Sequence, residues 1–195
     1  MASSIKDKMT ETPKYSIIHK HKNIEIRQYP AMIQAEVTVS GKLYRSAAET
    51  GFRVLAGFIF GNNISRQKID MTTPVQASRS EKIAMTTPVT ISGQDEFTVA
   101  FIMPSAYTLE SLPQPTDARV RFNPFPARQM AAIQFSGYFN QDTIQKKALQ
   151  LDQWLEENGY RPFGEHIVAG YNPPWVPGFL ARNEVLLQLH PDPDQ

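Results

Sequence analysis

The sequence predicts an α+β fold, in which a distorted antiparallel β-barrel is built from two similar β-rich halves and flanked by two α-helices. Residues 42–60 and 141–158 place apolar side chains at the spacing of one helix face, and no other long stretch does so. Short segments with the alternation or the apolar run of a strand fill most of the remaining chain. The order strands, helix, strands occurs twice, which indicates an internal duplication.

Composition excludes several classes of protein. A length of 195 residues suits one domain with a sizeable core that needs neither disulfides nor metal ions for stability. The absence of cysteine excludes disulfide scaffolds, zinc ribbons, thiolate nucleophiles and thiolate-ligated haem or iron–sulfur centres. With 20 basic and 19 acidic residues, the chain has no overall positive field that would attract nucleic acid.

The ends of the chain and its hydropathy predict a cytoplasmic protein with no membrane insertion. The first residues are polar and charged, unlike a secretory signal, and Ala2 excludes myristoylation. No apolar stretch approaches the ~20 residues of a membrane-spanning helix. We expect residues 1–13 to be a disordered tail, residues 14–190 to be a single domain, and residues 191–195 to be a C-terminal tail.

The first half begins with two expected strands, residues 24–27 and 33–39, in which apolar and polar side chains alternate. A helix over residues 42–60 follows. Its apolar stripe consists of Tyr44, Ala48, Phe52, Leu55 and Ile59. Gly51 and Gly57 lie off this stripe, so we expect them to allow the close approach of a neighbour or a ligand.

A short repeat follows the first helix. Residues 68–75 and 82–89 share seven of eight positions, and each copy ends in Met-Thr-Thr-Pro-Val. We expect two short strands that form a hairpin around a loop at residues 76–81. Met71 and Met85 should then lie on adjacent strands and be mostly buried.

The second half repeats the pattern of strands around one helix. It opens with an apolar strand over residues 97–103, which Pro104 ends. The remaining expected elements are, in order, a proline-punctuated loop (104–118), two strands (120–122 and 130–135) around a turn (123–126), the second helix (141–158) and two strands (167–171 and 184–189).

No motif supports hydrolytic or nucleotide chemistry, since the chain lacks a phosphate-binding glycine loop, a G-x-S-x-G elbow and an H-E-x-x-H helix. His19 and His21 share one strand face without the third ligand that a metal site needs. His190 lies in a tail rich in proline and aspartate. His166 precedes an apolar segment and is either a surface histidine at a strand end or an axial ligand beside an aromatic loop.

That aromatic loop, residues 171–179, holds three prolines and three aromatic residues among nine. It is either a stiff loop packed over the sheet or the apolar lip of a pocket for a flat hydrophobic ligand. In the second case Arg182, together with Arg45 and Arg53 on the first helix, would meet the ligand's carboxylates.

Several segments, in this order, closely resemble the SOUL haem-binding protein family over about residues 15–190. They are Ile24–Tyr29, Gly51-Phe52, both Met-Thr-Thr-Pro-Val copies, Phe101–Pro104, Leu112–Pro115, Phe135–Gly137, Tyr171–Trp175 and Arg182–Val185. The resemblance implies a distorted barrel of two similar halves with two helices. It also implies noncovalent binding of haem b or another tetrapyrrole, in a buffering, transport or delivery role without catalysis.

The resemblance also implies a site between the first helix and the loop before the last strand. The expected apolar faces come from Phe52, Met71, Met85, Tyr171, Trp175 and Phe179. Arg45, Arg53 and Arg182 are the expected partners of the propionates, and His166 is the candidate metal ligand. A histidine that serves as the axial ligand in an animal member falls at Gln28 here, and some relatives bind mainly by apolar contact.

Two other functions remain open at this level. One is an effector-sensing or protein-interaction module on the same duplicated fold, because similar β-α-β-β units occur in effector-binding domains of transcriptional regulators. The other is an enzyme acting on a tetrapyrrole, for which no motif argues. The expected partner is haem or porphyrin, and association of the chain with itself is also open.

Overall fold

The computed structural model of this chain describes residues 13–40, 44–64, 69, 75–79, 96–137, 140–171 and 178–190. Nine strands, two α-helices and one short 3₁₀ helix are assigned there. In chain order they are β1 (Ser16–His21), β2 (Ile24–Tyr29), β3 (Met32–Ser40), α1 (Tyr44–Ile59), β4 (Val75–Arg79), β5 (Glu96–Ile102), β6 (Arg121–Phe125), β7 (Arg128–Phe135), α2 (Gln141–Glu157), β8 (Pro162–Gly170), η1 (Gly178–Leu180) and β9 (Asn183–Leu189). The two predicted helices are confirmed to within two residues at each end.

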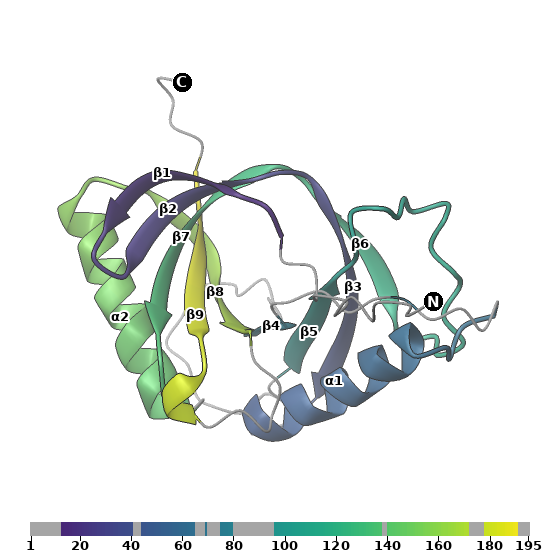
Figure 1. Cartoon of the computed structure of the whole chain (residues 1–195). Helices are drawn as coiled ribbons and strands as arrows, with labels where there is room; N and C mark the ends of the chain where they lie inside the picture. Colours follow the sequence, from purple (N-terminus) through teal and green to yellow (C-terminus); the bar gives the residue numbers. More distant parts are fainter. Residues whose placement is uncertain are drawn as a thin grey trace, which may run out of the picture.

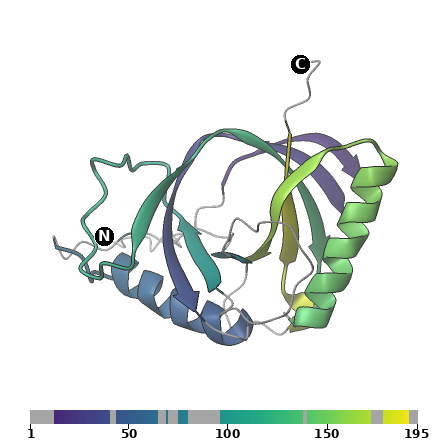
Figure 2. The same ribbon diagram turned by 180° about the vertical axis from the view of Figure 1, so that it is seen from behind.

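The strands form one antiparallel sheet in the order β1-β2-β7-β9-β8-β4-β5-β3-β6. The sheet curls into an arch, with α2 at one end and α1 at the other (Figures 1 and 2). Among the described residues no pairing joins the edge strands β1 and β6. The predicted α+β class and antiparallel pairing are therefore confirmed, whereas the described strands form a curled sheet with two edges in place of the expected distorted barrel.

The sheet order has an internal symmetry. The units β2-β3-α1-β4-β5 and β6-β7-α2-β8-β9 repeat one another, and β4 pairs with β8 where they meet. The first strand of each unit pairs within the other unit, β2 with β7 and β6 with β3. This exchange ties the halves into one sheet and agrees with the two similar halves predicted from the sequence.

Each helix packs on its own half of the sheet. In α1, Leu55 and Phe58 are buried against Val37 and Phe101 of the adjacent strands. Gly51 allows this contact, since an added Cβ would lie 2.5 Å from Val99 Cγ2. The predicted close approach of a neighbour at this glycine is thus confirmed.

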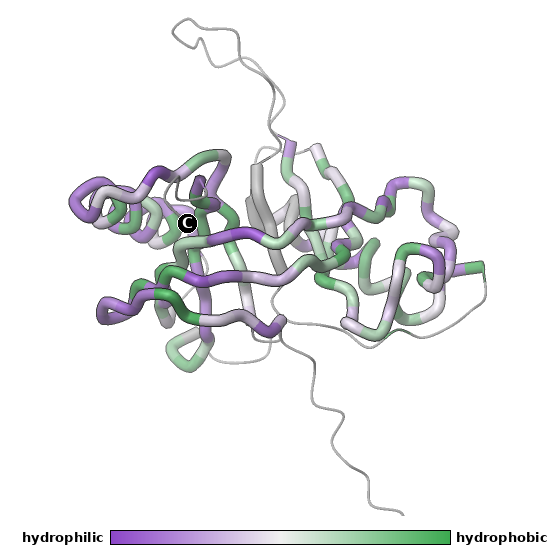
Figure 3. The backbone as a smooth tube through the Cα atoms, turned by 90° about the horizontal axis from the view of Figure 1, so that it is seen from above, coloured by the Kyte–Doolittle hydropathy of each residue, from purple (hydrophilic) through white to green (hydrophobic). Residues whose placement is uncertain are grey.

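Helix α2 covers the other half of the sheet. Its Leu151 and Leu155 are buried against residues that include Ile24 and Ile26 of β2. Asn140 caps its N-terminus by accepting a hydrogen bond of 2.8 Å from the Thr143 amide. Hydrophobic and hydrophilic residues alternate along β3, and Figure 3 shows such alternation along several extended segments. The sheet therefore has a second face, turned away from the helices.

Two local predictions are wrong. The expected hairpin loop at residues 76–81 overlaps β4, which pairs with both β5 and β8. The expected turn at 123–126 overlaps β6, which includes Pro124. Because β6 is an edge strand, a proline without an N–H group is tolerated there.

The helices found within the described ranges are all too short or too polar to cross a membrane.

Candidate functional site

The predicted site residues are distributed over several parts of the molecule. The structure does not describe Met71, Met85 or Trp175, or the side chain of Arg45. The predicted burial of the two methionines therefore lies outside the described residues. The other six predicted residues are described. They are Phe52, Arg53, His166, Tyr171, Phe179 and Arg182.

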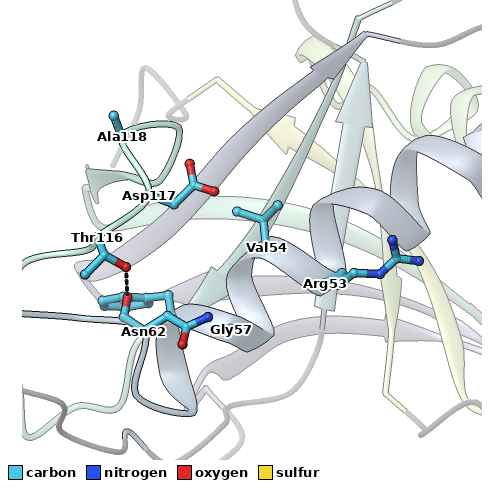
Figure 4. Close-up of a pocket in the computed structure, with 8 residues that line it drawn as sticks. Arg53, Val54, Gly57, Asn62, Thr116, Asp117 and Ala118 are labelled. Carbon is cyan, nitrogen blue, oxygen red and sulfur yellow. Dashed lines mark hydrogen bonds between the residues drawn. The ribbon is translucent and has the colours of Figure 1, made fainter.

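Phe52 and Arg53 are neighbours on α1 with different environments. Phe52 is half-buried, and its ring meets Phe101 edge-on with 5.3 Å between centroids. Arg53 is exposed and lines a cavity of about 440 Å³ between α1 and residues 116–118 (Figure 4). Phe52 therefore belongs to the core, whereas Arg53 is available at the surface.

The cavity has one apolar wall and one polar wall. Val54, Gly57 and Phe58 form the wall on α1. The Asn62 side chain lies close to Gly57, since an added Cβ there would be 2.8 Å from its amide nitrogen. Asn62 and residues 116–118 form the polar wall, in which Thr116 Oγ1 donates a hydrogen bond of 2.9 Å to the Asn62 carbonyl.

The negative charge in this cavity already has a partner. Arg119 donates two hydrogen bonds to the Asp117 carboxylate, at 2.7 and 3.0 Å. These bonds lower the pKa of Asp117 to about 2. None of the described residues pairs with Arg53, whose side chain extends away from Asp117 in Figure 4. The cavity thus has an uncompensated cation at its edge.

The helix-free face of the sheet holds a buried charge cluster that sequence reasoning missed. Its centre is the carboxylate of Glu184 in β9, which accepts five hydrogen bonds. Arg27 of β2 donates two at 2.8 and 2.9 Å, Arg182 donates two at 2.8 and 3.2 Å, and Tyr171 donates one at 2.6 Å. The side chains of Arg27 and Glu184 are both fully buried.

The remaining bonds of Arg27 extend this cluster. Its Nε donates to Glu25 at 2.9 Å, and its Nη1 donates to the Tyr29 hydroxyl at 3.0 Å. The Tyr15 ring lies 4.3 Å from the Arg27 guanidinium. In the sequence, Glu25 and Arg27 alternate with two isoleucines, which is the usual pattern of a strand with one face in solvent.

One feature of the sequence did indicate a buried charge: Glu184 is the single carboxylate in the mostly apolar strand β9.

Ionisation in the cluster follows from these bonds. Burial alone would raise the pKa of Glu184, but hydrogen bonds from Arg27, Tyr171 and Arg182 outweigh it, and the pKa is lowered. Burial raises the pKa of Tyr29 to about 12 and that of Tyr171 well above its usual range. The carboxylates of Glu25 and Glu184 are therefore ionised at pH 7, and the hydroxyls of Tyr29 and Tyr171 are neutral.

The structure brings Tyr171 and Arg182 together, as expected for one site. The Arg182 guanidinium lies 4.2 Å from the centre of the Tyr171 ring, and its side chain is 42% exposed. Because Arg27 also pairs with Glu25, the two arginines and the two carboxylates of the cluster balance one another in charge. Phe179 in η1 is 72% exposed, so its ring is accessible.

The four histidines lie at the α2 half of the sheet, away from Arg53. His166 Nε2 is 2.9 Å from Asp152 Oδ1 of α2. His19 and His21 both stack on Trp154 of α2, which confirms that they share one strand face. His190 stacks on Phe163 of β8. In the described part of the chain, no group of three or more potential metal ligands is present.

Gln28 is the residue at which the sequence resemblance predicts a histidine in an animal relative. It is half-buried in β2, and its side-chain amide donates a hydrogen bond of 3.2 Å to the Tyr29 carbonyl. An amide already engaged with the backbone gives no reason to assign an iron ligand here.

The fold is also found in solved structures of low sequence identity. The EcmrR C-terminal domain matches with a TM-score of 0.65 and 11% identity, over 91% of this chain and 99% of that one. A hydrolase from Listeria innocua matches with a TM-score of 0.57 and 13% identity, over 89% and 94%. At these identities the likeness concerns the fold alone.

Sequence comparison gives the family. Heme-binding protein 2 of Homo sapiens is 29% identical over 165 residues, which are 84% of this chain and 76% of that protein. Heme-binding protein 1 of Xenopus laevis is 26% identical over 161 residues, 83% and 80% of the two chains. The family model for the SOUL heme-binding protein matches residues 10–188. The chain therefore belongs to the SOUL heme-binding protein family.

Proposed function

We propose that this chain binds haem, or a related tetrapyrrole, without a covalent bond and acts as a carrier or buffer and not as an enzyme. Family membership supports binding, because relatives of 26% to 29% identity are named as heme-binding proteins. The structural observation that carries the proposal is Arg53, an exposed cation beside an apolar wall of α1.

The residues at α1 fit the organic part of the ligand. A porphyrin presents two apolar faces and carboxylates at one edge. The half-buried Val54 provides the accessible apolar part of the α1 wall, with the buried Phe58 behind it, and Arg53 is placed to pair with one propionate. Asp117 does not oppose this, because Arg119 neutralises it.

Attachment would be noncovalent, in agreement with haem b, because the chain has no cysteine for thioether links. None of the histidines lies on α1, so we assign binding to apolar contact and charge pairing. His166 remains the candidate iron ligand that experiment must test, and its ring is held by Asp152.

Arg182 is the second candidate for a propionate. Its side chain is 42% exposed, but its bonds to Glu184 already restrain it. We therefore expect Arg182→Ala to weaken hemin binding less than Arg53→Ala.

The test is a titration with hemin followed at the Soret band, repeated with metal-free protoporphyrin. We expect saturation near one equivalent, and Arg53→Ala should weaken binding of both ligands by roughly 2- to 5-fold, the scale of one exposed ion pair. Lys146→Ala, which removes an exposed cation from α2, is the matched control and should bind like the parent.

Two further variants test the predicted residues. Trp175→Ala should weaken hemin binding by about 1–3 kcal/mol if the aromatic loop covers the ligand, the range for a large buried aromatic side chain. His166→Ala should shift the Soret maximum only if this histidine binds iron, while protoporphyrin binding stays unchanged. Non-saturating hemin binding would favour the effector-sensing or protein-interaction alternative, and turnover of the pigment would favour an enzyme.

A further inference from the structure

A second cavity lies at the end of the sheet where β3 begins and β5 and β6 end. Its volume is about 520 Å³, and it shares no lining residue with the cavity at Arg53. Most of its surface is apolar, contributed by Met32, Ile33, Ile102, Met103, Tyr107 and Leu109. Leu109 is 43% exposed, so it offers apolar surface at the mouth of the cavity.

The walls of this cavity are held by their own hydrogen bonds. The Met103 amide donates to the Ile33 carbonyl at 2.8 Å, which fixes the segment after β5 against β3. Thr108 and Ser111 bond to each other through side chains and backbone, and the Leu112 amide donates to the Thr108 carbonyl at 3.0 Å. The loop at the mouth is therefore ordered without a ligand.

Four prolines, Pro13, Pro30, Pro104 and Pro124, also line the cavity. Proline fixes one backbone dihedral angle, so these positions lose little further freedom when a ligand binds. Pockets that take small molecules are usually preformed and apolar, with volumes of about 300–1,000 Å³. The volume and stiffness of this cavity match that description.

The charges at its rim select for an uncharged ligand. Lys14 and Glu110 line the cavity with opposite signs, so neither a cation nor an anion is favoured overall. The thioethers of Met32 and Met103 add polarizable surface that adapts to irregular apolar shapes. We propose that this cavity is a second ligand site, which takes an uncharged, largely apolar small molecule independently of the tetrapyrrole.

The probe for this site is N-phenyl-1-naphthylamine, an uncharged aromatic amine whose fluorescence rises in apolar surroundings. The exposed Ala31 lines the cavity, so Ala31→Trp should fill it and weaken probe binding at least about 10-fold, because the added ring occupies the space. The matched control is Ala118→Trp, since Ala118 is also exposed but lines the cavity at Arg53.

The two tryptophan variants should differ in their binding of the probe. Ala31→Trp should lose the probe and keep hemin, whereas Ala118→Trp should keep the probe. A second variant, Leu109→Ser, should also weaken the probe, and circular dichroism should show unchanged folding in all three. Non-saturable probe binding, retention of the probe by Ala31→Trp, or displacement of the probe by hemin would overturn the second site. Loss of the probe in Ala31→Trp and its retention in Ala118→Trp are measured without hemin, so this comparison tests the second site even if the parent protein does not bind hemin.

Discussion

Glu184 shows how much of this structure depends on single side chains. Its carboxylate is fully buried and is shared by Arg27 and Arg182. Burying one charge is costly unless its partners are buried with it, and removing one partner leaves an unpaired charge behind. The cluster therefore stabilises the contact between β2 and β9, two strands that are separated in the sheet by β7.

We expect Glu184→Gln to lower the free energy of unfolding by about 3–5 kcal/mol, because it removes one of the two buried carboxylates that pair with Arg27 and the one that Arg182 shares. Urea unfolding monitored by circular dichroism measures this. Glu156→Gln on the exposed surface of α2 is the control and should leave stability unchanged. Equal stability of the two variants would contradict the role assigned to the cluster.

Acid should weaken the same cluster. The pKa values of Glu184 and Glu25 are lowered from 4.5, so the unfolded chain binds their protons more readily than the native one. Their contribution is present above pH 4.5 and is lost as the pH falls through the native pKa values. Unfolding free energies measured between pH 3 and 6 should therefore fall less steeply with acid in Glu184→Gln than in the parent.

Base acts on two tyrosines of the cluster. The pKa of Tyr29 is raised to about 12 and that of Tyr171 is raised further, so both stay protonated in the native state beyond the ordinary value of 10. Absorbance at 295 nm should show two of the seven tyrosines ionising late or only upon unfolding. The stabilisation is complete below pH 10 and declines above it. Ionisation of all seven near pH 10 in folded protein would contradict the structure.

Sequence reasoning found the isolated cation Arg53 but not this cluster. An arginine on the exposed face of an amphipathic helix follows from local periodicity. The pair of Arg27 and Glu184 joins residues 157 positions apart, and only the sheet order brings them together. Nothing in the alternation of β2 distinguishes a buried charged face from a solvated one.

At the scale of elements, the position of α1 depends on close contact with β3 and β5. Gly51→Ala would place a Cβ 2.5 Å from Val99 Cγ2 and 3.3 Å from Val37 Cγ1. We expect this variant to lose about 1–3 kcal/mol of stability through overpacking. Thermal or urea unfolding of the purified variant checks this value.

Gly57→Ala on the same helix is the matched control. Its Cβ would meet only the exposed side chain of Asn62, at 2.8 Å from the amide nitrogen, and that side chain can move. Alanine improves helix propensity by about 1 kcal/mol, so this variant should be neutral or more stable. If both variants behaved alike, the close packing at Gly51 would not be the cause.

The elements that the sequence predicted well are those whose pattern is local. Both helices and the strands β2, β3, β5, β7 and β9 follow from periodicity within a few residues of their observed ends. β4 lies where a loop was expected, because its pairing with β5 and β8 is nonlocal. All six residues of β1 are exposed, so no apolar alternation marks it, and pairing with β2 defines it.

At the scale of the molecule, the fold consists of two similar units, and each unit offers its own surface around its helix. Each half carries its own helix and its own core. The two halves differ in chemistry. Helix α1 carries a cavity and Arg53, which pairs with no residue that the structure describes, whereas the histidines and Trp154 gather at α2. We therefore assign the proposed tetrapyrrole site to the half of the molecule that contains α1.

That assignment is tested most directly by nuclear magnetic resonance with hemin, whose paramagnetic iron broadens the signals of nearby amides. The account predicts selective broadening of amides in α1 and residues 116–118 at one equivalent, while α2 stays sharp. Arg53→Ala should reduce the broadening at equal hemin concentration, and Lys146→Ala should not. Broadening centred on α2 and His166, or spread evenly over the whole chain, would contradict the account.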